Sequence, residues 1–153
     1  MVRAGDYENW ERSGLWKSWD PQEVLVSEGE YVEGNKVGKW TWYKEGEDKG
    51  WEENYNNGVL HGKFNNLSPY AKIRGVGSFS EGVKTGEWEE YYSSADGSLE
   101  RSQSGAYQFG KKVGVWSLYA KNGRRIAEGS YKDDIKVGDW TEGQDIEFGS
   151  RYF

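Results

Sequence analysis

Hydrophobic and polar positions along this chain follow a repeating pattern built on large aromatic residues. The pattern aligns on one aromatic position, called the anchor below, which is occupied by Tyr7, Tyr31, Tyr55, Phe79, Tyr107 and Tyr131. Successive anchors lie 24 residues apart, except for one interval of 28 residues. An internal period of this length is typical of repeat proteins, in which each unit is one supersecondary structure. We predict six repeats, near residues 5–28, 29–52, 53–76, 77–104, 105–128 and 129–153.

Glycines stand at fixed distances from the anchor. Seven residues after it, the six repeats have Gly14, Gly38, Gly62, Gly86, Gly114 and Gly138. Two residues further comes a second aromatic, which is Trp16, Trp40, Phe64, Trp88, Trp116 or Trp140. Five repeats also have glycine two residues before the anchor, and five have glycine or aspartate three residues after it. We expect the glycines beside the aromatics to let the rings lie flat over the backbone.

Each repeat is predicted to be one antiparallel hairpin. Glycine tolerates the positive φ of tight hairpin turns, so the spacing from Gly34 to Gly38, which recurs in other repeats, indicates a loop of a few residues. Turns are therefore expected near residues 34–37, 58–61, 82–85, 110–113 and 134–137. Helix is not expected, because 22 glycines interrupt the chain and no apolar stripe of 3.6-residue period survives between them.

A single hairpin is marginally stable in water, so the repeats must stack. Nine Trp and eleven Tyr supply the apolar surface for a repeated aromatic core. The predicted fold is all-β: one domain over residues 1–153, formed by a single-layer antiparallel meander of about six stacked hairpins, elongated and twisted. Pro69 cannot donate to a ladder, which predicts a bulge, edge or loop there. The stretch from Gln144 to Phe153 is expected to form a closing strand.

A further set of aromatics lies three residues after the second aromatic, at Trp19, Tyr43, Tyr91 and Tyr119. In a regular strand these side chains face away from the second aromatic. Two arrangements are open. The array either curls and buries both sets, or it leaves an exposed aromatic and acidic strip suited to protein binding.

The charge of the chain bears on its partners. The formal net charge is −6, from 20 basic and 26 acidic residues. Phosphate contacts need clustered Lys and Arg, so this balance argues against a nucleic-acid ligand. It suits a basic protein partner, or simply solubility.

The absence of cysteine excludes disulfides and thiolate metal sites, and it favours a cytoplasmic location over secretion. No apolar run approaches the ~20 residues of a membrane span.

Groups that could carry catalysis are sparse. His61, the only histidine, occupies a repeat position held elsewhere by Val37 and Val113, and we interpret it as a variant of that position. No Ser–His–Asp set, phosphate-binding loop or zinc spacing can be assembled. The adjacent pairs Glu52-Glu53 and Glu89-Glu90 should point to opposite faces of a strand rather than form an acid/base dyad. We therefore predict a protein without enzymatic activity, cofactor or metal.

Three stretches carry a resemblance to a known family. The MORN repeat is resembled by residues 122–131 with the following Gly138-Asp139-Trp140, by residues 29–40 and by residues 107–116. The spacing Tyr-x-x-Gly-x-x-x-Gly-x-Trp-x-x-Tyr looks like the bacterial variant found in antitoxins of the YwqK type. The resemblance covers about residues 5–142 and implies MORN-like hairpins without catalytic residues. Bacterial members are mostly considered toxin-neutralising or immunity proteins, and eukaryotic members are scaffolds with proposed lipid contacts.

These observations together predict a non-catalytic protein-binding module, specifically an antitoxin or immunity protein that neutralises a toxin, for which a basic partner is the best match. The expected contact residues are Trp42, Glu52, Glu53, Glu89, Glu90 and Tyr92. Alternatives are a carbohydrate- or choline-binding aromatic array, since aromatic cages suit quaternary amines, and a scaffold at a membrane surface, which the net charge opposes.

Overall fold

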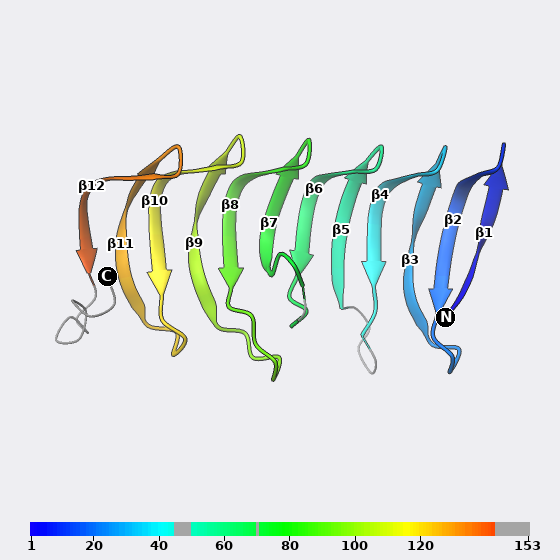
Figure 1. Ribbon diagram of the computed structural model, residues 1–153, viewed down its shortest axis with the longest axis horizontal. Helices are drawn as coiled ribbons and strands as arrows, with labels where there is room; N and C mark the ends of the chain where they lie inside the picture. The colour runs from blue at the N-terminus through cyan, green and yellow to red at the C-terminus, as the bar shows by residue number, and fades with distance from the viewer. Residues whose placement is uncertain (45–49, 70, 143–153) are drawn as a thin grey trace.

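A computed structural model describes residues 1–44, 50–69 and 71–142, and these residues form twelve strands in one antiparallel sheet. The strands are β1 (Val2–Glu8), β2 (Glu11–Trp19), β3 (Leu25–Val32), β4 (Asn35–Trp42), β5 (Trp51–Asn56), β6 (Val59–Asn66), β7 (Gly75–Ser80), β8 (Val83–Tyr91), β9 (Arg101–Gln108), β10 (Lys111–Tyr119), β11 (Arg125–Lys132) and β12 (Ile135–Glu142). Their order in the sheet is their order in the chain, and no helix occurs in the described ranges (Figure 1). The predicted all-β meander is confirmed.

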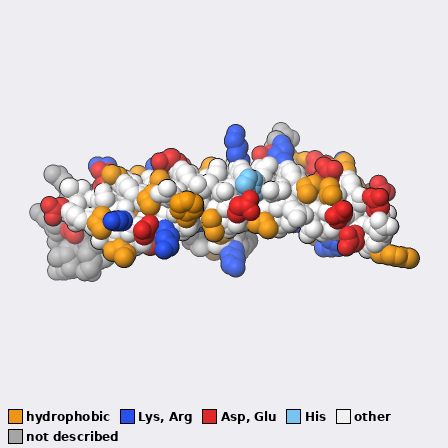
Figure 2. Space-filling view, turned by 90° about the horizontal axis from the view of Figure 1, so that it is seen from above, with side chains coloured by type: hydrophobic (Ala, Val, Ile, Leu, Met, Phe, Trp, Pro, Cys, Tyr) orange, Lys and Arg blue, Asp and Glu red, His pale blue; other side chains and the backbone are white. Residues whose placement is uncertain are grey.

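The sheet is open and elongated. Its two outer strands, β1 and β12, stand at opposite ends of the row, so the strands do not close on themselves (Figure 1). Viewed from the edge that carries the tight turns, the molecule is a narrow slab with charged side chains of both signs along it (Figure 2). The arrangement in which the array curls and buries both faces is therefore wrong.

The tight turns hold two residues each and lie slightly earlier than expected. In the turn between β5 and β6, Asn57 and Gly58 have φ values of 49° and 82°. Positive φ at both central residues is the requirement of the type I′ turn, which matches the twist of the flanking strands. The predicted turn at 58–61 and its equivalents were therefore misplaced, because β6 already begins at Val59.

The second glycine of each predicted loop belongs to the returning strand. Gly38 has a φ of 62° and lies in β4, where the pairing with β3 shifts register between Glu28 and Glu30. Such a shift marks a β-bulge, a place where one strand carries extra residues relative to its partner. The same left-handed glycine recurs at Gly14, Gly62, Gly86, Gly114 and Gly138. One glycine therefore makes the turn, and the next lets the strand bulge before the second aromatic.

Neighbouring hairpins are joined along the turn edge by repeated backbone hydrogen bonds. The amide of Gly34 donates to the carbonyl of Arg12, and the amide of Gly58 donates to that of Lys36. The opposite edge carries longer connections, including the loop with Pro69, as expected. Arg74 is buried there and donates to the carbonyl oxygens of Leu67, Tyr92 and Gly97, so it fastens two of these loops together.

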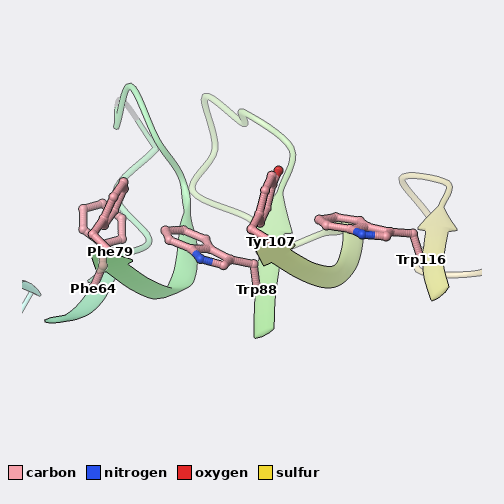
Figure 3. Packing of buried hydrophobic residues seen from close by; sticks show 5 residues of the cluster. All are labelled: Phe64, Phe79, Trp88, Tyr107 and Trp116. Carbon is pink, nitrogen blue, oxygen red and sulfur yellow. The ribbon is translucent and has the colours of Figure 1, made fainter. Parts of the chain in front are cut away.

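The core is a ladder of rings on one face of the sheet. Trp88 and Trp116 are 1% and 0% exposed, and Tyr107 lies between them, edge-on to both indoles (Figure 3). Edge-to-face contact suits the quadrupole of aromatic rings. Anchors and second aromatics alternate in this way from Tyr7 to Trp40, and again from Phe79 to Trp140. The predicted repeated aromatic core is thus confirmed in these repeats, with the rings in edge-to-face contact.

The glycine before each anchor makes room for an indole. A Cβ atom at Gly77 would overlap the ring of Trp88, and the same holds for Gly5, Gly29, Gly105 and Gly129 with their own tryptophans. The third repeat differs, because Glu53 replaces the glycine and faces Phe64, a smaller ring. Loss of the glycine thus coincides with loss of the indole.

Candidate functional site

The two faces of the sheet differ in chemistry. Cross-strand partners share a face and successive residues alternate between faces. The face that carries the anchors and second aromatics is called the aromatic face below, and the other is called the polar face. On the polar face, Tyr43 donates to Glu28 and Tyr91 donates to Glu89. These tyrosines therefore lie opposite the tryptophans of their own strands, as expected.

A row of cations covers the aromatic face. Five repeats have Lys or Arg five residues after the anchor, at Arg12, Lys36, Lys84, Lys112 and Lys136. Each cation lies over the second aromatic of its own repeat, and the distances to the ring centroid range from 4.5 Å for Lys136 to 5.0 Å for Arg12. A cation over an indole face is stabilised by the quadrupole of the ring. The third repeat again differs, since Leu60 replaces the cation where Phe64 replaces the indole.

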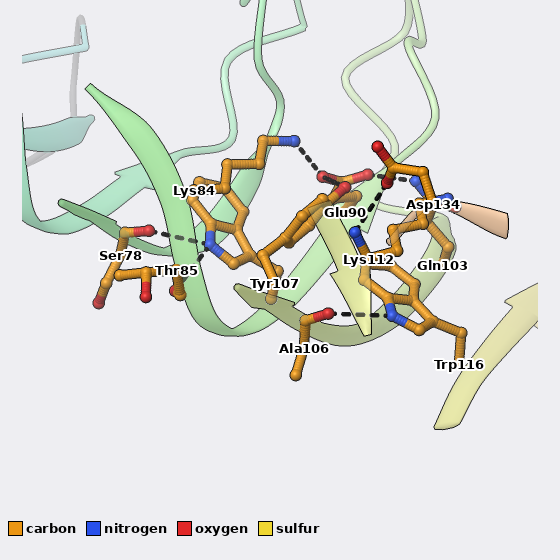
Figure 4. Close-up of polar contacts among 11 residues, drawn as sticks. Ser78, Lys84, Thr85, Glu90, Gln103, Ala106, Tyr107, Lys112, Trp116 and Asp134 are labelled. Atoms are coloured by element: carbon orange, nitrogen blue, oxygen red, sulfur yellow. Dashed lines mark hydrogen bonds and ion pairs between the residues drawn. The ribbon is translucent and has the colours of Figure 1, made fainter. Parts of the chain in front are cut away.

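In the C-terminal half, the cations are bound to polar partners within the sheet. Glu90 accepts hydrogen bonds from Lys84, Gln103 and the hydroxyl of Tyr107, and Lys112 donates to Gln103 at 2.7 Å (Figure 4). The Glu90 side chain is only 12% exposed. Burial acts to raise the pKa of Glu90, but the hydrogen bonds from Lys84 and Gln103 outweigh it and lower the pKa. We call these five residues the Glu90 cluster.

In the N-terminal half, the same face is hollowed into a groove of about 460 Å³, called the N-terminal groove below. Four tryptophans line it, namely Trp16, Trp40, Trp42 and Trp51. Its polar lining includes Arg3, Arg12, Lys36, Ser18 and Ser27, and no Asp or Glu is among the described residues that line it. Trp42 and Trp51 face each other across β4 and β5 with nearly parallel rings. The groove therefore combines flat apolar walls with positive charge.

One continuous row of paired residues crosses the polar face from β2 to β12. It runs Lys17, Glu28, Thr41, Glu52, Asn65, Val76, Glu89, Ser104, Ser117, Glu128 and Thr141. Four of its members are glutamates, and we call it the glutamate row. Glu28, Glu52 and Glu89 have basic neighbours, with N···O distances of 3.3 Å to Lys17, 3.7 Å to Lys39 and 3.0 Å to Arg101. Glu28 and Glu89 also accept hydrogen bonds from Tyr43 and Tyr91, and Glu128 accepts them from Ser117 and Arg125. The carboxylates of the row thus have partners within the sheet but remain partly exposed, and surface ion pairs of this kind contribute little free energy.

The six predicted contact residues do not form one surface. Trp42, Glu53 and Glu90 lie on the aromatic face, whereas Glu52 and Glu89 lie on the polar face in the glutamate row. Tyr92 follows β8 in a loop at the edge opposite the tight turns, and its hydroxyl donates a hydrogen bond to the carbonyl of Tyr119. Glu53 and Glu90 are already bound internally: Glu53 accepts from Tyr55 and Asn66, and Glu90 belongs to its cluster.

Other sequence features have structural roles. The Nδ1 of His61 accepts a hydrogen bond from the amide of Glu81 in the next hairpin turn, at 3.1 Å. The valines at the equivalent positions of other repeats have no such acceptor, so this side-chain contact is particular to the third repeat. Over residues 1–44, 50–69 and 71–142, no group of three or more metal-ligating side chains comes together. The same ranges hold no helix with the length and apolar character needed to cross a membrane.

Sequence reasoning missed both the row of cations and the N-terminal groove. The signal for the cations was present, because a basic residue follows five of the six anchors at the same distance.

A comparison with protein-family models gave no match, and a search of curated proteins gave none either. The resemblance to MORN repeats therefore stays a prediction, and function is argued from the geometry.

Proposed function

We propose that this protein is a binding module without catalytic activity, and that it neutralises a basic protein partner such as a toxin. The observation that supports the proposal is the glutamate row, which sets Glu28, Glu52, Glu89 and Glu128 along one flat face. Adjacent strands are about 4.8 Å apart, so these four carboxylates span roughly 40 Å from β3 to β11. A partner with a matching line of cations would gain association rate and orientation from such a row.

The choline-binding alternative is weakened by the same geometry. A quaternary amine needs an open aromatic face. Here five of the six second aromatics already have a Lys or Arg of the chain over their rings. A bound amine would have to displace these cations, some of which are held by the Glu90 cluster.

The proposal is tested by recovery of a partner from the native host and by titration of that partner at two ionic strengths. The variant Glu52→Lys/Glu89→Lys reverses two charges of the glutamate row and should weaken binding by about tenfold or more, mainly through a slower association rate. The matched control is Glu23→Lys, a charge reversal in the exposed loop between β2 and β3. Equal affinity of wild type and the double variant would contradict the proposal, as would recovery of no protein partner.

A further inference from the structure

The N-terminal groove and the Glu90 cluster are built from the same repeat positions. In the cluster, Lys84 lies over the Trp88 and Tyr107 rings, and the Glu90 carboxylate accepts hydrogen bonds from Lys84 and from the hydroxyl of Tyr107. The groove repeats the first part of this arrangement. Arg12 lies over the rings of Trp16 and Tyr31 and donates to the hydroxyl of Tyr31 at 3.1 Å.

Among the described residues that line the groove, none supplies the carboxylate that completes the cluster. Ser18 and Ser27 stand at the repeat positions of Glu90 and Gln103, and they are paired across β2 and β3 as those two residues are across β8 and β9. These shorter side chains leave space in front of Arg12, and their hydroxyls hydrogen-bond to each other. Across the described ranges, no ion pair engages Arg3, Arg12 or Lys36.

We propose that the N-terminal groove binds an extended acidic segment of a protein partner, with one carboxylate of that segment taking beside Arg12 and Ser18 the place that Glu90 takes in its own cluster. The Glu90 cluster is the template, since it shows that a carboxylate fits between the cation, the anchor hydroxyl and the neighbouring strand. The inference goes beyond the proposed function, because it concerns the opposite face of the sheet and a segment of opposite charge.

A second contact is provided by Lys36 on β4. Its ammonium lies 4.6 Å from the Trp40 ring centroid and 5.1 Å from those of Trp42 and Tyr55. Burial lowers the pKa of Lys36, although the charge of Glu53 opposes that shift. Because Glu53 is held by Tyr55 and Asn66, an incoming carboxylate remains a favourable partner for the desolvated ammonium.

The positions of the cations set the spacing of the segment. Arg3 on β1 is the cross-strand partner of Ser18 on β2, so the carboxylate beside Arg12 and Ser18 also lies next to Arg3. From there to Lys36 on β4 is two to three strand spacings, about 10–14 Å. In an extended peptide, residues i and i+4 point to the same side and lie about 13 Å apart. An acidic residue at each of these positions, with an aromatic residue between them over β3 to contact Trp42, matches the groove in charge and shape.

A peptide is favoured over a continuous polyanion by the charge of the whole chain. The net charge of −6 repels a ligand with a charge on every unit. Two isolated carboxylates flanking an apolar residue avoid most of this repulsion and still reach the cations.

The test uses the full chain and a synthetic probe, the blocked heptapeptide Gly-Asp-Thr-Phe-Ser-Asp-Gly, followed by calorimetry at low and moderate ionic strength. The control peptide has Asn in place of both Asp. Arg12→Gln should weaken binding of the acidic peptide about tenfold, as expected for loss of a charge-assisted hydrogen bond. Ser18→Glu should abolish binding, because it supplies the missing carboxylate from within. Lys136→Gln removes the equivalent cation over Trp140, outside the groove, and should leave the affinity unchanged.

Several outcomes would overturn the inference. Equal affinity for the acidic and Asn peptides would show that the cations do not select the ligand. If the peptide bound Arg12→Gln and Ser18→Glu as tightly as wild type, its binding site would lie outside the N-terminal groove. This result is independent of whether a basic partner binds the polar face. Binding of single-stranded oligodeoxythymidylate or of vesicles rich in phosphatidylserine, lost in Arg12→Gln while the peptide does not bind, would assign the groove to a phosphate-bearing ligand instead.

Discussion

At the scale of single residues, this fold depends on pairs of a buried tryptophan and a glycine whose missing side chain makes room for the indole ring. Trp88 can be almost fully buried because Gly77 has no side chain, and its indole nitrogen then donates to the carbonyl of Ser78. The ring, the glycine and the hydrogen bond form one unit. Gly86, in the same hairpin, serves a different purpose, since its φ is 66° and no atom lies near its Cβ position.

Two glycine substitutions separate these roles. Gly77→Ala should destabilise the protein by about 1–3 kcal/mol, because the new methyl group displaces the indole. Gly86→Ala should cost about 1–2 kcal/mol through backbone conformation alone. Urea denaturation gives both free energies of unfolding, and near-ultraviolet circular dichroism reports the rings. The ring signal should change in Gly77→Ala and persist in Gly86→Ala; an unchanged ring signal in both would contradict the assigned role of Gly77.

A pH dependence follows from the Glu90 cluster. Hydrogen bonds lower the pKa of Glu90 in the folded chain below the ordinary value of 4.5, despite its burial. The stabilisation is therefore complete above that value and is lost as pH falls through the lower folded-state pKa. Glu90→Gln should be less stable than wild type at neutral pH by about 1–3 kcal/mol, and the difference should shrink in acid.

Denaturant titrations of wild type and Glu90→Gln at neutral pH and near pH 3 measure this difference. Glu87→Gln is the matched control, because Glu87 is exposed on the polar face beside Trp88. A difference that stays constant with pH would mean that Glu90 is not ionised in the cluster. Although Glu90 is one of the contact residues expected from the sequence, its substitution should therefore change stability first.

At the scale of the hairpin, the third repeat shows that residue types at three positions of the repeat change together. Glu53, Leu60 and Phe64 stand where the other repeats have glycine, a cation and an indole, with no exception among the remaining five. A side chain at position 53 excludes an indole at position 64, and without the indole a cation at position 60 has no large ring face to cover. The three departures therefore have one physical cause.

This coupling can be measured with a double-mutant cycle. Phe64→Trp alone should destabilise the protein, because the indole meets the Glu53 side chain. Glu53→Gly/Phe64→Trp should recover stability, with a coupling free energy of about 1 kcal/mol or more between the two sites. Thermal or urea unfolding of the four proteins gives the value. Additive effects of the two changes would indicate that residues 53 and 64 vary independently.

The repeat spacing predicted some features of the hairpin correctly, but it did not place the turns. Strand order, the packing of Tyr107 against Trp88 of the neighbouring repeat and the absence of helix from the described ranges followed from spacing alone, because a fixed period admits few arrangements. The turns were misplaced because both Gly34 and Gly38 have positive φ, and sequence cannot distinguish a turn glycine from a bulge glycine. The predicted closing strand at Gln144–Phe153 lies outside the described residues.

The candidate site was harder to predict than the fold. Placing Glu52 and Glu53 on opposite faces followed from strand alternation, and so did the split between Glu89 and Glu90. Their exposure did not follow, because it depends on side chains from other repeats: Gln103 and Tyr107 enclose Glu90 from the neighbouring strand. The N-terminal groove arises in the same way, from the small size of Ser18 and Ser27 relative to their equivalents.

At the scale of the whole molecule, the open meander makes this protein a one-dimensional array with two different faces. Extensive contacts join only strands that are consecutive in the chain, so each hairpin depends on its immediate neighbours. In such an array, stability is close to a sum of repeat and interface terms, and local unfolding need not spread to the far end. The two proposed binding surfaces can then be perturbed separately, because the N-terminal groove lies in β1–β5 whereas the glutamate row extends to β11.

Hydrogen exchange of a variant with a damaged C-terminal half tests this independence. Trp116→Ala removes the most buried indole and should cost about 3–5 kcal/mol locally. Mass spectrometry of exchanged peptides should then show lost protection in β9–β11, while β2–β4 exchange as in wild type. The acidic peptide should still bind this variant, because Arg12 and Ser18 lie several strands away. Equal loss of protection in every strand would mean that the sheet unfolds as one cooperative unit, in which case damage at Trp116 would reach the N-terminal groove.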